Sequence, residues 1–179
     1  EAINHSFNFD YDNDKSKKPI SLHLEGSMGI GKTALCRQVA EEMKLHLVIV
    51  FLAQFEPTDI GGLRMPDGDS MKVLRPDWIV TDEEWQELKA QGYVGILYVF
   101  DELPQAPVLN MNIYAQICDE YRVGEYHIDR SHCYIMSCGN KLSDKAGTNA
   151  MPSHLVDRLS FLEIEANLDD TCSYFAKTG

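Results

Sequence analysis

The stretch of sequence that decides the fold is Gly26-Ser27-Met28-Gly29-Ile30-Gly31-Lys32-Thr33, which matches the pattern GxxxxGK(S/T) in full. Glycines in such a loop let the backbone N–H groups turn inward onto phosphate oxygens. Lys32 adds a positive charge for the outer phosphates, and the hydroxyl of Thr33 can hold Mg²⁺. These residues, together with Ala34, are therefore predicted to bind the phosphates of a nucleotide.

The flanking residues have the patterns of a strand and a helix, which is the context that this loop requires. Residues 20–24 alternate apolar and polar side chains, as a strand does. Residues 34–43 place Leu35, Val39 and Met43 four apart, on one face of a helix. That helix would direct the positive end of its dipole at a bound anion. The context favours a phosphate-binding loop over an ordinary glycine-rich turn.

The composition limits the class of protein. The chain has 179 residues, of which 44% are hydrophobic, so it can bury one sizeable core and is most simply one domain. We expect a cytoplasmic protein, because the sequence shows neither an apolar run of membrane-spanning length nor the pattern of a signal peptide. The net charge of −12 disfavours direct binding of nucleic acid, since an acidic surface neutralises phosphates poorly.

The cysteines are expected to be buried thiols. Their number is odd and no CxxC pair occurs, which argues against a disulfide framework and against a zinc ribbon. His132 and Cys133 lie near Cys138 in the sequence, but on a predicted core strand, so a metal site there is disfavoured.

Strand and helix patterns alternate along the rest of the chain. Further strands are expected at 45–52, 95–100, 132–137 and 161–164, and helices at 81–92, 107–118 and 152–157. Thr81-Asp82-Glu83-Glu84 has the form of a capping box, after which Trp85 and Leu88 are expected to face the core. Residues 53–80 hold too many glycines and prolines for a long regular element. The alternation predicts an α/β fold with a parallel sheet and right-handed crossovers.

Two acidic residues, Asp101 and Glu102, follow the strand at 95–100. In a parallel sheet, ligands bind outside the carboxyl ends of the strands, the edge at which the phosphate loop also begins. The carboxylate of Asp101 would orient Mg²⁺ opposite the Thr33 hydroxyl. Glu102 could polarise a water molecule for attack on a γ-phosphate and so act as the general base. The alternative is an acidic pair that caps the next helix.

Asn140 follows the strand at 132–137 and is expected at the same edge of the sheet. Its amide both donates and accepts hydrogen bonds, so it could hold the attacking water or contact the γ-phosphate. An asparagine that merely forms a turn is the alternative.

A positive charge that reaches the γ-phosphate accelerates phosphoryl transfer and is often supplied by another subunit. Arg158, between a predicted helix and the last strand, is the best candidate, ahead of Arg122 and Arg130. The alternative for Arg158 is a salt bridge with Asp157 or with a neighbouring helix.

With these motifs in place, the sequence resembles the AAA+ ATPases, and in particular their MoxR-like and dynein-related (midasin-like) branch. Phage and bacterial members of this branch look most similar in sequence. The resemblance spans residues 18–179. It rests on the phosphate loop and on Phe55-Glu56-Pro57-Thr58-Asp59-Ile60-Gly61-Gly62-Leu63, Phe100-Asp101-Glu102-Leu103, Gly139-Asn140 and Asp157-Arg158. In that branch a phenylalanine usually follows the last pair, where this chain has Leu159.

The resemblance implies a P-loop NTPase fold, a three-layer sandwich whose five-stranded parallel sheet has the order 5-1-4-3-2. It also implies ATP and Mg²⁺ as ligands, a hexameric ring with nucleotide at the subunit interfaces, and mechanical remodelling of a protein partner. Many MoxR-like members act with a protein that carries a von Willebrand A domain.

The resemblance also divides the chain. We expect an N-terminal arm at 1–17, the nucleotide-binding core at 18–166, and at 167–179 only the beginning of a helical lid, whose nucleotide-contacting arginine would be missing. Residues 61–70 fall where this branch often carries an insertion that lines the ring pore, so they are a candidate for contacting the partner. A plain surface loop is the alternative for these residues.

Three other functions remain open at this point. A helicase loader or a restriction-type NTPase would share the core but engage nucleic acid. A small-molecule kinase would use the same phosphate loop, without needing Asp101-Glu102 and an asparagine after the next strand. A nucleotide switch would bind the same ligand without hydrolysing it.

Overall fold

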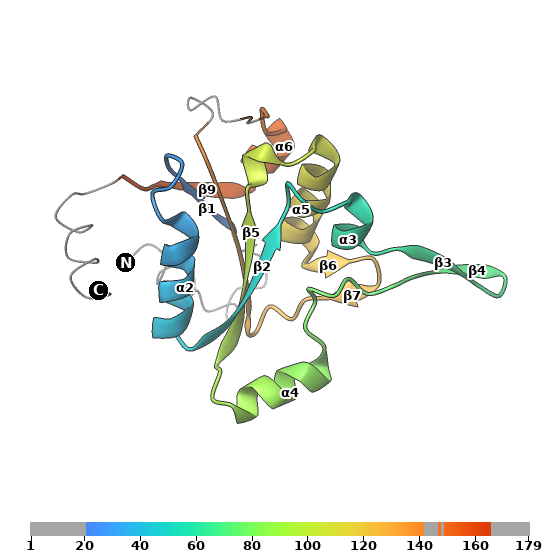
Figure 1. Cartoon of the computed structure of the whole chain (residues 1–179). Helices are drawn as coiled ribbons and strands as arrows, with labels where there is room; N and C mark the ends of the chain where they lie inside the picture. Colours follow the sequence, from blue (N-terminus) through green and yellow to red (C-terminus); the bar gives the residue numbers. More distant parts are fainter. Residues whose placement is uncertain (1–20, 142–146, 148, 166–179) are drawn as a thin grey trace.

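The computed structural model describes residues 21–141, 147 and 149–165, and its centre is a parallel sheet (Figure 1). The five strands are β1 (Ser21–Glu25), β2 (Leu45–Phe51), β5 (Gly95–Asp101), β8 (Cys133–Gly139) and β9 (Leu159–Glu163). Their order is β2-β5-β8-β1-β9, and every neighbouring pair is parallel. If the five strands are numbered 1 to 5 in chain order and read from the β9 edge of the sheet, their order is 5-1-4-3-2. The predicted α/β class with a five-stranded parallel sheet is confirmed.

Burial of the strands follows their place in the sheet. All seven residues of β5 are buried, which suits an apolar strand covered on both faces. The strand expected at 45–52 is present as β2, which lies at the edge of the sheet. Of its residues only Leu45 and Val50 are buried, and the other five are half-buried.

One face of the sheet is covered by α2 (Lys32–Glu42), the helix that follows the phosphate loop. The predicted apolar face is only partly right. Cys36 and Ala40 form the buried contact, while Leu35 and Met43 are half-buried at its margin. Small side chains at the centre of a contact let a helix approach a sheet closely. The spacing of apolar residues alone does not show that Cys36 and Ala40 form this centre.

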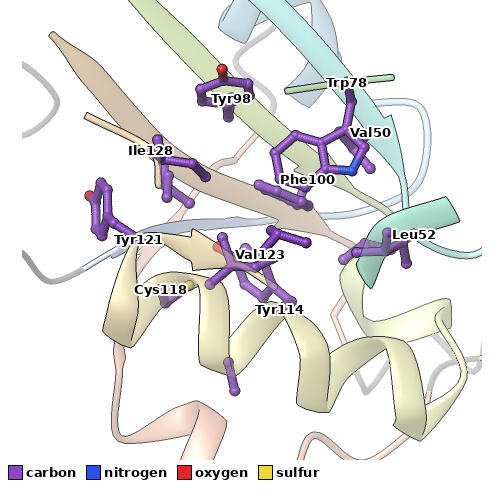
Figure 2. Close-up of a cluster of buried hydrophobic side chains, with 14 of the residues drawn as sticks. Val50, Leu52, Trp78, Tyr98, Phe100, Tyr114, Cys118, Tyr121, Val123 and Ile128 are labelled. Carbon is purple, nitrogen blue, oxygen red and sulfur yellow. The ribbon is translucent and has the colours of Figure 1, made fainter. Parts of the chain in front are cut away.

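The opposite face is covered by α3 (Pro57–Gly61), α5 (Val108–Glu120) and α6 (Ser153–Val156). Figure 2 shows the aromatic side chains that fill this side of the core. The ring of Phe100 lies 4.8 Å from that of Tyr114 on α5 and meets the Trp78 ring edge-on at 5.3 Å. Sheet and helices therefore form three layers, with a separate apolar cluster on each face of the sheet.

Residues 53–80 are more regular than the sequence suggested. Besides α3 they contain a hairpin of β3 (Arg64–Asp67) and β4 (Ser70–Val73), which extends away from the body of the domain (Figure 1). Gly68 in its turn has a φ of +59°. The two residues of the turn are Gly68 and Asp69, and Gly-Asp between two strands is a hairpin signal that was not used in the prediction. A second hairpin, β6 (Arg122–Val123) with β7 (Tyr126–His127), was also not predicted.

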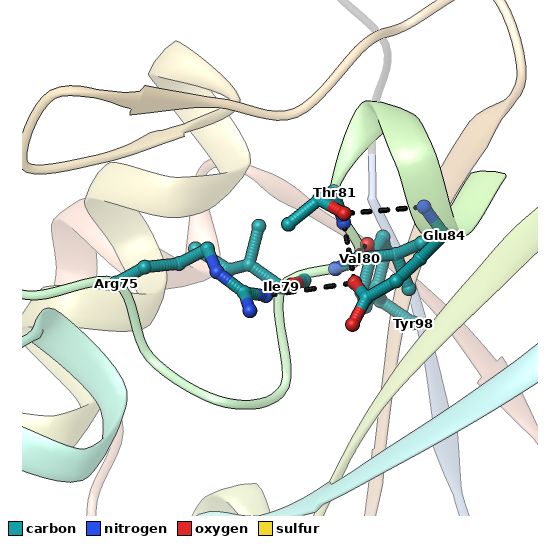
Figure 3. Close-up of polar contacts among 6 residues, drawn as sticks. All are labelled: Arg75, Ile79, Val80, Thr81, Glu84 and Tyr98. Carbon is teal, nitrogen blue, oxygen red and sulfur yellow. Dashed lines mark hydrogen bonds and ion pairs between the residues drawn. The ribbon is translucent and has the colours of Figure 1, made fainter.

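The segment before α4 (Asp82–Ala90) is fixed by polar contacts (Figure 3). The predicted capping box is confirmed: the Thr81 hydroxyl accepts from the Glu84 N–H, and the Glu84 carboxylate accepts from the Thr81 N–H. Arg75 donates to the Ile79 carbonyl and pairs with Glu84 at 3.7 Å. As predicted, Trp85 is buried and Leu88 packs against the core.

Within the described residues, no helix is both long and apolar enough to cross a membrane. Four cysteines lie in this part of the chain, and all are buried free thiols: Cys36, Cys118, Cys133 and Cys138. The expectation of buried thiols is confirmed for these four. Cys172, the arm at 1–17 and the beginning of the lid at 167–179 lie outside the described residues.

A buried histidine on β1 makes the stability of the fold depend on pH. His23 is fully buried, its Nδ1 lies 2.8 Å from the Ser137 hydroxyl, and its ring meets Phe161 edge-on. Burial, and secondly the positive charge of Lys32, lower the pKa of His23 from 6.5 to about 4. His23 is therefore neutral in the folded protein at neutral pH.

This pKa predicts a loss of stability in mild acid. Between pH 6.5 and about 4 the unfolded chain protonates His23 and the folded chain does not, so the free energy of unfolding should fall by about 3 kcal/mol as pH falls through this window. Urea denaturation at several pH values measures the loss. It should largely disappear in His23→Gln and persist in His127→Gln, which alters an exposed histidine on β7. An equal loss in His23→Gln would show that other groups cause it.

Candidate functional site

The phosphate loop connects β1 to α2, and its glycines allow its shape. Gly31, the residue before α2, has a φ of +94°, a conformation that residues with a Cβ atom rarely adopt. Gly26 is packed so closely that a Cβ atom there would lie 2.8 Å from the carbonyl oxygen of Ile164. Met28, by contrast, is exposed at the tip of the loop. The pattern of glycines in the sequence thus corresponds to backbone positions that need them.

The ammonium group of Lys32 lies within the loop that precedes it. Its Nζ donates to the carbonyl oxygens of Gly26 and Ser27, each at 2.9 Å, and to Oδ1 of Asn140 at 2.8 Å. The residue is only 8% exposed. The structure therefore brings Asn140, at the end of β8, to the phosphate loop as the sequence analysis expected.

Asp101, the last residue of β5, is in contact with Thr33. The Thr33 hydroxyl donates to Oδ2 of Asp101 at 2.6 Å, while Oδ1 accepts from the Glu102 N–H at 2.8 Å and from the Cys138 thiol at 3.0 Å. Hydroxyl and carboxylate oxygens are the hard ligands that Mg²⁺ prefers. The two residues predicted to hold the metal thus fit it by position and by chemistry.

Glu102 follows Asp101 in an unusual backbone conformation. Its φ of +59° and ψ of 33° lie in the left-handed region, which costs a residue other than glycine about 1–3 kcal/mol. It precedes η1 (Leu103–Gln105), but its side chain makes no capping hydrogen bond to that turn. The geometry argues against the alternative of a helix-capping acidic pair. Strained residues of this kind cluster at functional sites.

Arg158 is not brought to this site. It precedes β9, whose first residue pairs with Ser21, whereas the phosphate loop begins after Glu25, about 13 Å further along the sheet. Its guanidinium donates to Oδ2 of Asp119 on α5 at 3.2 Å and to the His154 carbonyl. The ion pair considered as an alternative is therefore present, with Asp119 as the partner.

The two other arginines considered are also engaged elsewhere. Arg122 pairs with Glu120 at 2.7 Å. Arg130 lies over the Tyr121 ring at 4.7 Å and donates to the Asp119 carbonyl.

Cys138 was expected only to be a buried thiol, but it also contacts Asp101. A signal was available, because alternation along β8 places residue 138 on the face of the sheet that carries α2. His23, whose pKa responds to Lys32, was likewise not identified as a neighbour of the loop.

Comparison with known proteins adds evidence on the fold. No protein-family model matches the chain, and no curated protein matches it. Among solved structures, the "putative ATPase" of Cytophaga hutchinsonii superposes with a TM-score of 0.59 at 18% sequence identity, over 88% of this chain and 46% of that one. The present chain thus spans about half the length of that protein. At this identity the likeness shows a shared fold alone. Together with the five-stranded parallel sheet, the likeness shows an α/β fold consistent with that of P-loop ATPases.

Proposed function

We propose that this chain binds ATP with Mg²⁺ and hydrolyses it. The observation that carries the proposal is the meeting of Lys32, Thr33, Asp101 and Asn140 at the carboxyl edge of one parallel sheet. Four polar residues from three separate motifs have no need to meet there for packing alone. Nucleotide sites of α/β proteins occupy this edge.

The chain's own residues have distinct parts in the proposed reaction. Lys32 exchanges its carbonyl partners for phosphate oxygens, and the N–H groups at the start of α2 bind the same anion. Thr33 and Asp101 hold Mg²⁺, which when bound neutralises charge on the terminal phosphates. Glu102 accepts a proton from the attacking water, and Asn140 orients that water or the γ-phosphate.

Two substitutions separate binding from hydrolysis. Glu102→Gln keeps the shape but removes the base, so turnover should fall at least about 100-fold while ATP affinity remains. Lys32→Ala removes charge-assisted hydrogen bonds, so affinity should fall at least about tenfold. Phosphate release and the fluorescence of a labelled ATP analogue measure the two effects. Full turnover in Glu102→Gln would exclude Glu102 as the base.

We further propose that the protein is an AAA+ ATPase of the MoxR-like branch and works as a ring, most simply a hexamer. The motifs at 55–63 and at Asp157-Arg158 support this assignment. The side chain of Arg158 is 36% exposed and lies at the end of the sheet remote from its own phosphate loop. An arginine in that position suits the site of a neighbouring subunit.

The proposed work of the ring is to remodel a protein partner in the cytoplasm, in the manner of family members that act with a von Willebrand A domain protein. The hairpin of β3 and β4 is the proposed contact surface. Its Met65 and Met71 are 45% and 58% exposed, and methionine adapts to varied partner surfaces. An open cavity of about 360 Å³ between α3 and the segment 74–78 lies at its base.

The ring and the role of Arg158 are tested by mixing two inactive variants. Arg158→Ala subunits keep a complete phosphate loop, and Lys32→Ala subunits keep the arginine. If Arg158 acts on the neighbouring subunit, mixed rings contain complete sites and should regain ATP hydrolysis that neither variant shows alone. The mixture is assayed at concentrations at which light scattering shows assembly. Assembled mixed rings without activity would contradict action across the interface.

A further inference from the structure

Cys138 is placed to control the carboxylate of Asp101. It lies on β8, two residues before Asn140, and is fully buried. Its thiol donates to Oδ1 of Asp101 at 3.0 Å, the oxygen that also accepts from the Glu102 N–H. The other carboxylate oxygen of Asp101, Oδ2, accepts a hydrogen bond from the Thr33 hydroxyl. The two oxygens of one carboxylate thus have separate partners.

The surroundings of the sulfur explain why it affects more than one element. Cys138 packs in the same buried cluster on the α2 face of the sheet as Cys36, which lies three residues after Thr33 on α2. The helix that carries Thr33, the strand that carries Asp101 and the strand that leads to Asn140 therefore meet at this thiol. A smaller apolar residue at 138 would leave Asp101 Oδ1 with one fewer donor in a buried place.

We propose that Cys138 is a positioning residue for the magnesium site, because its thiol fixes the rotation of the Asp101 carboxylate so that Oδ2 faces the Thr33 hydroxyl, the other residue that would hold the metal. The inference rests on the proposed binding of ATP with Mg²⁺. Partners of metal ligands commonly change metal affinity 10- to 100-fold when they are removed. A thiol is a weak donor, so the lower end of that range is expected here.

The test measures metal binding without turnover, in a Glu102→Gln background. Mn²⁺ replaces Mg²⁺ and is titrated by electron paramagnetic resonance in the presence of ATP, and the affinity for ATP without metal is measured in parallel. Cys138→Ala should weaken Mn²⁺ binding about tenfold and leave metal-free ATP affinity unchanged. Cys138→Ser retains a donor and should remain within about threefold of the parent protein.

Cys133→Ala is the matched control, since it alters a buried cysteine of the same strand on the opposite face of the sheet. It should leave Mn²⁺ affinity unchanged, and thermal unfolding of each variant reports any loss of packing. Equal Mn²⁺ binding by Cys138→Ala and its parent would overturn the role of Cys138 but not the proposed function. Equal losses of Mn²⁺ affinity in Cys138→Ala and Cys138→Ser would do the same. Absence of metal-dependent ATP binding in the parent would overturn the proposed function, and the inference with it.

Discussion

The structure around the phosphate loop depends on one buried ammonium group. An amine that is almost removed from water needs compensating oxygen atoms, and Lys32 finds them on Gly26, Ser27 and Asn140. These bonds fold the loop back over the start of α2 and join it to the end of β8. A phosphate group offers the same ammonium stronger, charged acceptors. The loop is thus held in a conformation in which an anion can replace these oxygen atoms as the partner of Lys32.

The order of the strands makes this arrangement possible. β8 lies between β1 and β5, so Asn140 follows the strand that separates the phosphate loop from Asp101. The carboxylate of Asp101 is shared in the same way, by a hydroxyl from α2, the N–H of the next residue, Glu102, and a thiol from β8. Lys32 and Asp101 therefore each join neighbouring elements, and both contact residues on or directly after β8, so a shift of β8 would disturb both charges.

Features with a local signal could be predicted from the sequence. The phosphate loop, the five parallel strands and the capping box at Thr81 depend on patterns within a few residues. The buried face of α2 was only partly predicted, because close approach selected Cys36 and Ala40 over larger neighbours. The pairing of Arg158 with Asp119 joins residues 39 apart, and the contact of Cys138 with Asp101 joins residues 37 apart. Alternation along β8 indicates the face of the sheet on which Cys138 lies, but no local pattern identifies its partner, because contacts at such separations follow from packing.

The most direct test of the account is a crystal structure with Mn²⁺ and a non-hydrolysable ATP analogue, with the metal located by its anomalous scattering. We expect the metal between the Thr33 hydroxyl and the Asp101 carboxylate, with Lys32 Nζ on phosphate oxygen in place of the Gly26 and Ser27 carbonyls. Nucleotide bound elsewhere, or Lys32 still bonded to its own loop beside bound phosphate, would contradict the account.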